Sequence, residues 1–205
     1  DGKPAFAPSV IADKSAGLIA ANGLMAALFQ RLRTGKGVYM EIGMFESMVA
    51  YTLLEHQFGA IFDPPEGTTG YTRLISAERK PYATRDGYLS MLPYTDQHWR
   101  AFWNLAGTPE MADDPRYRTL AERTRNIDTL YASTGEALLA RSTQDWLNAL
   151  REAEIPCGPI NLFDDLRSDP HLQAVGMFRP YEHPSEGALD LLDSGLRFNR
   201  EQLPV

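Results

Sequence analysis

The sequence is poor in cysteine, in positive charge and in long apolar runs, and each shortage excludes a class of protein. Cys157 is the only cysteine among 205 residues, which rules out a disulfide framework within the chain and fits a reducing compartment such as the cytoplasm. The net charge of −7 argues against nucleic acid as a partner. No uncharged apolar run reaches about 18 residues, so we expect no membrane span. The four histidines are too scattered to predict a metal site.

A long apolar helix is the strongest feature that the sequence does contain, and we predict it over residues 14–33. Its apolar residues recur three and four positions apart, at Leu18, Ala21, Met25, Leu28 and Leu32. Arg31 and Arg33 suit the negative C-terminal end of the helix dipole. Gly35 then provides a C-terminal stop.

Asp13, at or next to the N-cap of this helix, is the candidate catalytic residue. Aspartate is among the commonest N-caps, so its carboxylate could serve only the backbone of the first turn. The same position favours an ionised carboxylate and offers N–H donors to an anion, as a nucleophile or base requires. The small residues Ser15, Ala16 and Gly17 leave room for a substrate. The residues alone leave both interpretations open.

The rest of the chain predicts an α/β protein with more than one part. A strand over residues 38–42 and a helix over residues 44–57 follow the first helix, which is the order of an α/β layer. So short a strand needs neighbours from elsewhere. We expect part of a large domain over residues 1–57, a linker over 58–80, a small α/β domain over 81–178, and a return linker with the start of a C-terminal segment over 179–205.

The expected small domain begins with a hairpin over residues 82–92 around an Asp86-Gly87 turn. A helix capped by Asp96 and ending at Gly107 should follow, and its aromatic residues are typical of a core. Further helices are predicted over 127–140, with Asn126 as cap, and over 144–154, with Ser142 or Thr143 as cap. An extended segment over 155–160, a short helix over 162–167, a helix start at 169–171, and strands over 177–182 and 189–198 complete the prediction.

In combination, several motifs in order along the chain resemble the class III CoA-transferases of the CaiB/BaiF type. This family includes formyl-CoA transferase, carnitine CoA-transferase and, as a close relative, α-methylacyl-CoA racemase. The matching segments are the Asp13 helix with Ala26-Ala27-Leu28, Arg33-Thr34-Gly35-Lys36-Gly37, Phe45-Glu46, Pro81-Tyr82-Ala83-Thr84-Arg85-Asp86-Gly87, Ala112-Asp113-Asp114-Pro115-Arg116-Tyr117, Ile155-Pro156-Cys157-Gly158-Pro159-Ile160, Asp169-Pro170 and Gly176-Met177.

The resemblance implies a fold and an assembly that the residues alone do not show. Family members are about twice as long, with a Rossmann-like large domain built from both chain ends and a small α/β domain joined to it by extended linkers. Two chains form an interlocked homodimer. This chain would be the middle portion of such a protein, and the segment with most CoA contacts would precede it. We therefore expect the chain alone to be inactive.

The resemblance also implies a chemistry for Asp13, which falls on the catalytic aspartate of the family. Coenzyme A would move from an acyl-CoA thioester to a carboxylic acid through an aspartyl intermediate, with CoA as the substrate carrier and no covalently bound cofactor or metal. In the alternative, a racemase or epimerase of CoA thioesters, Asp13 would be an acid/base paired with a histidine upstream. Residues 72–80 have no glycine run, which argues against a formyl/oxalate enzyme and against a glycine lid.

Other residues are weaker candidates for a role at the site. Glu46 is either a first-turn acid of its helix or a partner of the catalytic group. Cys157 reads as a small buried residue, and no role is assigned to the remaining polar candidates, namely Glu55, His56, His98 and His171. Arg73, Arg79 and Lys80 are either solvated linker charges or face an anionic ligand.

Overall fold

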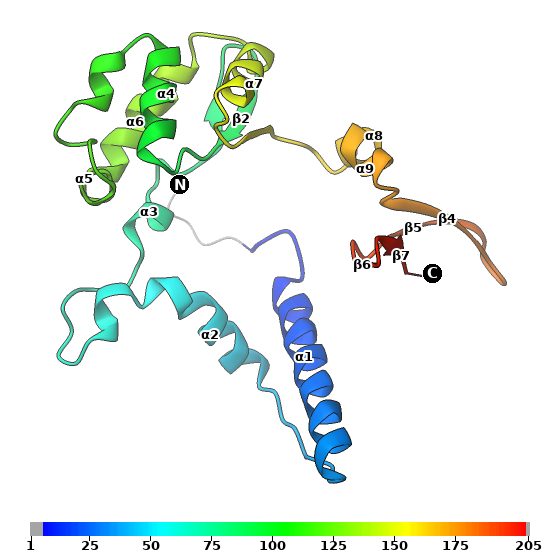
Figure 1. Cartoon of the computed structure of the whole chain (residues 1–205). Coiled ribbons are helices and arrows are strands. Elements are labelled where there is room, and N and C mark those ends of the chain that lie inside the picture. The colour runs from blue at the N-terminus through cyan, green and yellow to red at the C-terminus, as the bar shows by residue number, and fades with distance from the viewer. Residues whose placement is uncertain (1–5, 204–205) are drawn as a thin grey trace. The chain divides into compact units, whose positions relative to one another are not determined.

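The structure is a computed structural model that describes residues 6–203. The chain divides into two compact units, residues 1–76 and 77–205, and each is described by itself (Figure 1). Among residues 6–203, no helix has both the length and the apolar character that a membrane span requires.

The first unit is built on two helices, α1 (Ile11–Thr34) and α2 (Met44–His56). Helix α1 begins three residues earlier than predicted, and it ends as predicted at Gly35, whose φ of 70° is the left-handed conformation that glycine adopts easily. The predicted strand over 38–42 is wrong for this chain, because residues 36–43 form no strand and the described residues offer them none to pair with.

Helix α1 carries apolar side chains on two opposite faces. Gly23 faces the segment that follows the helix, because a Cβ on Gly23 would lie 2.5 Å from the sulfur of Met40. On the other face Leu18, Met25 and Leu32 are 68%, 66% and 84% exposed. Ala16 is the only buried residue among residues 6–76. A helix that is apolar on both faces belongs to the interior of a larger structure.

The predicted linker contains an ordered closed loop over residues 56–71, followed by α3 (Thr72–Ile75). Its neck is closed by the Gly70 amide, which donates to the His56 carbonyl at 2.7 Å. A short 3-10 helix, η1 (Phe58–Ile61), opens the loop. Within it Gly59 and Gly67 lie so close that a Cβ on Gly59 would be 2.7 Å from the Gly67 Cα.

The second unit contains a three-stranded antiparallel sheet in the order β1-β2-β3. The strands are β1 (Tyr82–Ala83), β2 (Tyr88–Met91) and β3 (Cys157–Pro159). The predicted hairpin and the predicted extended segment therefore become neighbours in one sheet. Between β2 and β3 the chain forms α4 (Asp96–Ala106), η2 (Pro109–Ala112), α5 (Leu120–Arg125), α6 (Ile127–Leu138) and α7 (Thr143–Glu152).

One face of this sheet and the helices enclose an aromatic core. Leu89 and Met91 of β2 point into it, while Tyr88 of the same strand is exposed. The aromatic residues of α4 lie in this core, as predicted. The buried cluster is Tyr82, Leu89, Met91, Trp99, Phe102, Trp103, Tyr117, Ile127, Leu130, Tyr131, Leu138, Trp146, Leu147, Leu150 and Ile155.

The helix caps of this unit agree with the sequence in part. Ser142 caps α7, where its hydroxyl accepts the Asp145 amide at 3.1 Å. The cap of α4 is Thr95 rather than the predicted Asp96, and its hydroxyl accepts the His98 amide at 3.1 Å. Asn126 occupies the cap position of α6 without a capping bond from its side chain. Helix α5 was not predicted.

The remaining elements of the second unit are short. Helices α8 (Asp165–Ser168) and α9 (Pro170–Ala174) precede a hairpin of β4 (Phe178–His183) and β5 (Gly187–Leu192). The predicted strand over 189–198 is two strands, because β5 ends at Leu192 and β6 (Arg197–Phe198) pairs with β7 (Glu201–Gln202) instead. Buried Asp193 lies between them and pairs with Arg179 and Arg197.

Candidate active site

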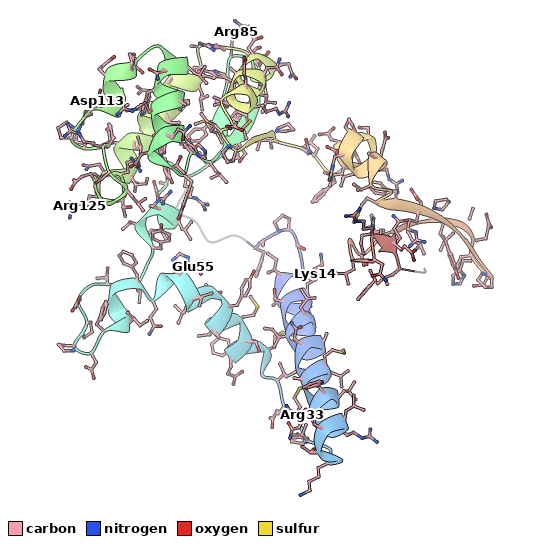
Figure 2. The ribbon with its side chains drawn as sticks, viewed as in Figure 1. Lys14, Arg33, Glu55, Arg85, Asp113 and Arg125 are labelled. Atoms are coloured by element: carbon pink, nitrogen blue, oxygen red, sulfur yellow. The ribbon has the colours of Figure 1, made fainter. Side chains whose placement is uncertain are left out.

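The structure places Asp13 in the first turn of α1, as the third residue of the helix rather than its cap. The cap position is Val10, and no side chain accepts a capping hydrogen bond there. Figure 2 shows the adjacent Lys14 at the start of α1 and Arg33 at its far end. The carboxylate therefore lies at the positive end of the helix dipole.

The Asp13 side chain is exposed to solvent. In the part of the chain that the structure describes, its carboxylate has no hydrogen-bond or ion-pair partner. The Lys14 ammonium next to it donates to the Ser9 hydroxyl at 3.0 Å instead. The first helical hydrogen bond runs from the Lys14 amide to the Val10 carbonyl at 3.1 Å, so the amides before it remain available as donors. Gly17, one turn further on, has open space where a Cβ would stand.

Glu46 holds the equivalent position in α2, the first turn of a helix without a side-chain cap. Its carboxylate folds back over the preceding backbone, where a Cβ on Gly43 would lie 2.1 Å from Oε2. This is the geometry of a first-turn acid that serves its own helix.

The side chains of Cys157, His98 and His56, which the sequence leaves without a catalytic role, make contacts within the fold. Cys157 on β3 is partly buried with its sulfur 3.9 Å from the Leu147 carbonyl oxygen, and burial raises the pKa of this thiol. Nδ1 of His98 accepts the Tyr94 amide at 3.2 Å. His56 closes the loop over 56–71, a role that the sequence analysis missed. No three acidic, histidine or cysteine side chains among residues 6–203 are grouped as a metal site requires.

Three carboxylates, those of Asp86, Asp114 and Asp193, have lowered pKa values because they accept hydrogen bonds that hold local structure together, not because they form a reactive centre. The Thr143 amide, a hydrogen-bond donor to Asp86, lowers the pKa of that carboxyl. A hydrogen bond from Arg116 does the same to the pKa of Asp114. Asp86, Asp114 and Arg116 lie in motifs that carry the family resemblance. In this structure these three residues hold turns and helix starts in place through their hydrogen bonds.

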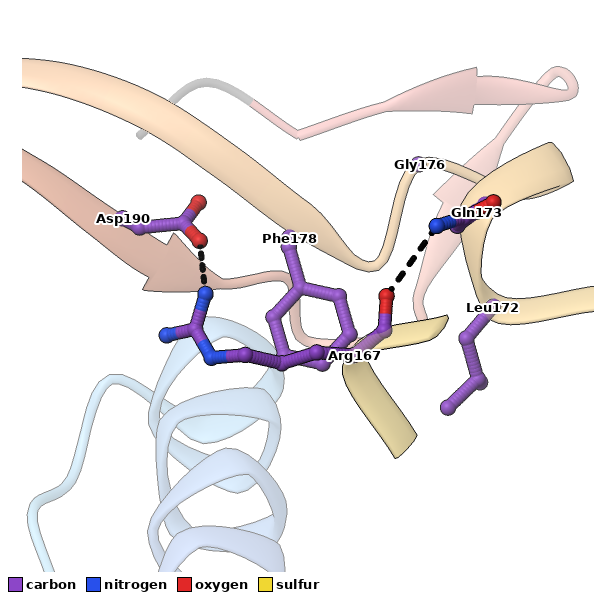
Figure 3. Close-up of a pocket in the computed structure, with 6 residues that line it drawn as sticks. All are labelled: Arg167, Leu172, Gln173, Gly176, Phe178 and Asp190. Atoms are coloured by element: carbon purple, nitrogen blue, oxygen red, sulfur yellow. Dashed lines mark hydrogen bonds and ion pairs between the residues drawn. The ribbon is translucent and has the colours of Figure 1, made fainter. Parts of the chain in front are cut away.

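A hollow of about 310 Å³ opens beside the β4–β5 hairpin (Figure 3). The Arg167 guanidinium stacks over the Phe178 ring at 5.1 Å and pairs with Asp190 at 2.5 Å. Gln173 donates to the Arg167 carbonyl at 3.2 Å. The arginine is thus already neutralised and ties α8 to the hairpin.

Comparison with known proteins identifies the family. The sequence matches CoA-transferase family III over residues 1–205. It is 27% identical over 200 residues to succinyl-CoA:glutarate CoA-transferase of Mus musculus, covering 98% of this chain and 46% of that protein. It is 28% identical over 168 residues to acetyl-CoA:oxalate CoA-transferase of Acetobacter aceti, covering 78% and 41%. The chain thus spans about half the length of these curated relatives.

Solved structures of two other proteins have a fold similar to that of this chain. A CaiB/BaiF family protein from Brucella suis superposes with a TM-score of 0.67 at 26% identity, covering 100% of this chain and 53% of that one. Rv3272 from Mycobacterium tuberculosis superposes with a TM-score of 0.77 at 20% identity, covering 100% and 54%. The mixed α/β structure therefore corresponds to part of a class III CoA-transferase. The chain belongs to CoA-transferase family III.

Proposed function

We propose that the protein containing this chain transfers coenzyme A from an acyl-CoA thioester to a carboxylic acid, with Asp13 as the nucleophile. The observation that carries the proposal is the exposed, unpartnered carboxylate of Asp13 in the first turn of α1. By contrast, the oxygens of Asp86, Asp114 and Asp193 already accept hydrogen bonds, which lower the pKa values of these carboxyls. Family membership supplies the reaction class.

In the first half-reaction, an Asp13 oxygen attacks the thioester carbonyl and expels CoA as its thiolate, which leaves an aspartyl–acyl anhydride. The thiolate then attacks the aspartyl carbonyl and releases the first acid as a carboxylate, so an aspartyl-CoA thioester remains. The acceptor carboxylate attacks that thioester and forms a second anhydride with thiolate release. Attack of the thiolate on the new acyl carbonyl yields the new acyl-CoA and restores the Asp13 carboxylate.

The start of α1 suits these steps for two physical reasons. The positive end of the helix dipole lies beside the attacking carboxylate. The free amides of the first turn can donate to the negative oxygen that develops at each carbonyl under attack. The side-chain crowding that would block a thioester is absent at Gly17.

Trapping the intermediate tests the role of Asp13 directly. We expect the whole protein, incubated with acyl-CoA and hydroxylamine, to carry a hydroxamate on Asp13 in peptide mass spectra. Asp13→Asn should abolish the adduct and lower kcat by at least about a thousandfold. Succinate, glutarate and oxalate, the acids in the names of relatives, are reasonable acceptors for a first panel.

Glu46→Gln is the matched control, because it removes the corresponding first-turn acid of α2. It should keep both the adduct and most of the activity. An active Asp13→Asn enzyme, or an adduct on another residue, would overturn the proposal. Deuterium uptake at the α-carbon of the acyl group without any acceptor acid would instead point to a racemase.

A further inference from the structure

His56 makes two hydrogen bonds that bring together the two ends of the closed loop over residues 56–71. The backbone carbonyl of His56 accepts the Gly70 amide at 2.7 Å, and its ring Nδ1 accepts the Tyr71 amide at 3.2 Å. The Phe58 and Tyr71 rings stack at 5.8 Å across the same neck. Further inside, the Gly59 carbonyl accepts the amides of Glu66 and Gly67. The loop therefore has an inner closure made by backbone alone and an outer closure that uses a titratable ring.

The Tyr71 bond fixes the protonation state of the ring. A backbone amide can only donate, so Nδ1 must present its lone pair and the proton of the neutral ring lies on Nε2. The Glu55 carboxylate, 3.6 Å from Nε2, favours that tautomer (Figure 2 labels Glu55 on α2). Arg73 also lies near this closure, where its Nη1 is 3.4 Å from the Tyr71 hydroxyl.

We propose that His56 is a proton-operated latch: its neutral ring holds the C-terminal end of the loop closed, and protonation of Nδ1 releases Tyr71. An imidazolium donates from both nitrogens, so the Tyr71 amide would face a second donor instead of an acceptor. The Glu55 carboxylate remains close enough to pair with the charged ring. The Gly59 closure contains no titratable group and persists.

Release of Tyr71 would also affect helix α3, which begins at the next residue. Tyr71 directly precedes α3, and its carbonyl accepts the amides of Leu74 and Ile75 in that helix. The first unit ends only a few residues later, at Ser76. Release of Tyr71 on protonation of the ring therefore loosens the point where the chain leaves the first unit.

Residue-resolved hydrogen exchange of the whole protein tests the latch. After correction for intrinsic exchange, we expect the Tyr71 amide to exchange about five- to tenfold faster near pH 5 than near pH 8, the effect of losing one hydrogen bond. The Glu66 and Gly67 amides should not change. His56→Asn offers an oxygen near the position of Nδ1 that does not titrate, so Tyr71 should stay protected at both pH values.

His56→Ala removes the acceptor, so the Tyr71 amide should exchange rapidly at both pH values. His171→Asn, on the exposed surface of α9, is the matched histidine control and should behave as the wild type. Corrected Tyr71 exchange that is the same at both pH values in the wild type would overturn the latch. Retention of the pH step in His56→Asn or His56→Ala would overturn it equally.

Discussion

Arg123 shows how much one side chain can hold together in this protein. It is 3% exposed, and its guanidinium donates to the carbonyls of Tyr117 and Arg118 at 2.9 and 3.3 Å and pairs with Asp96. The residue thus connects α5, the turn before it and the start of α4. An arginine can make this set of bonds because its donors form a rigid fork, which a lysine lacks.

We predict that Arg123→Met lowers the free energy of unfolding of the second unit by about 2–3 kcal/mol, because the buried Tyr117 carbonyl and the partly buried Arg118 carbonyl lose a charged donor. Arg123→Lys should lose most of the same amount. Urea unfolding followed by tryptophan fluorescence measures the effect, since all three tryptophans lie in this core. Arg125→Met, an exposed arginine of the same helix, should change stability by less than about 0.5 kcal/mol. Equal stabilities of the two variants would contradict the prediction.

The caps show what the sequence can and cannot settle at single residues. The sequence predicts Ser142 or Thr143 as the cap of α7 because both stand at the start of a clear helical pattern, and the structure selects Ser142. At α4 the sequence offers two residues of capping type in a row, Thr95 and Asp96, and the cap is Thr95 rather than the predicted Asp96. The choice depends on Arg123, which is far away in sequence and attracts the Asp96 carboxylate. Tertiary contacts of this kind leave no local signal.

At the scale of elements, the Asp86 turn joins the β1–β2 hairpin to the start of α7. Oδ1 of Asp86 accepts the Thr143 amide at 2.7 Å and the Thr143 hydroxyl at 3.0 Å, and the hydroxyls of Thr84 and Thr143 lie 2.7 Å apart. The Arg85 amide also donates to the Arg141 carbonyl at 3.0 Å. The hairpin was predictable from its Asp-Gly turn, but this junction was not, because its two sides are far apart in sequence.

We predict that Asp86→Asn destabilises the second unit at neutral pH and that the difference from the wild type shrinks at low pH. The Thr143 bonds lower the pKa of Asp86 in the folded chain. Its contribution to stability is therefore complete above the ordinary aspartate pKa of about 3.9 and is lost as the pH falls through the lowered value. Urea midpoints at neutral and strongly acidic pH measure both ends. Glu152→Gln, an exposed acid of α7, should show no such convergence.

Residues 36–43 show that a β-prone sequence pattern alone does not predict a strand. Its alternation is β-prone, yet a strand exists only when a neighbour supplies hydrogen bonds. The described residues supply none, so the segment lies beside Gly23 of α1 without a partner strand. The same reasoning explains why the extended residues 157–159 did become a strand, since β2 lies next to them.

At the scale of the whole molecule, the two units differ in whether they contain a core. All fifteen residues of the buried apolar cluster lie between Tyr82 and Ile155, whereas Ala16 alone is buried among residues 6–76. The sequence predicted the α/β class and the aromatic core from composition and periodicity. It could not predict that the long apolar helix would remain uncovered, because periodicity reports which residues seek burial and not what covers them.

We therefore predict that residues 77–205 unfold cooperatively on their own, and that residues 1–76 do not. A cooperative transition requires a packed interior, which is present in the second unit and absent among the described residues 6–76 of the first. Urea titrations followed by tryptophan fluorescence for residues 77–205, and by far-ultraviolet circular dichroism for residues 1–76, measure the two cases.

Within residues 77–205, Leu130→Ala at a fully buried site should lower the free energy of unfolding by about 2–5 kcal/mol. Leu139→Ala, 51% exposed at the end of the same helix, should cost far less. A sharp transition in residues 1–76, or equal costs for the two leucines, would show that the cores are assigned wrongly.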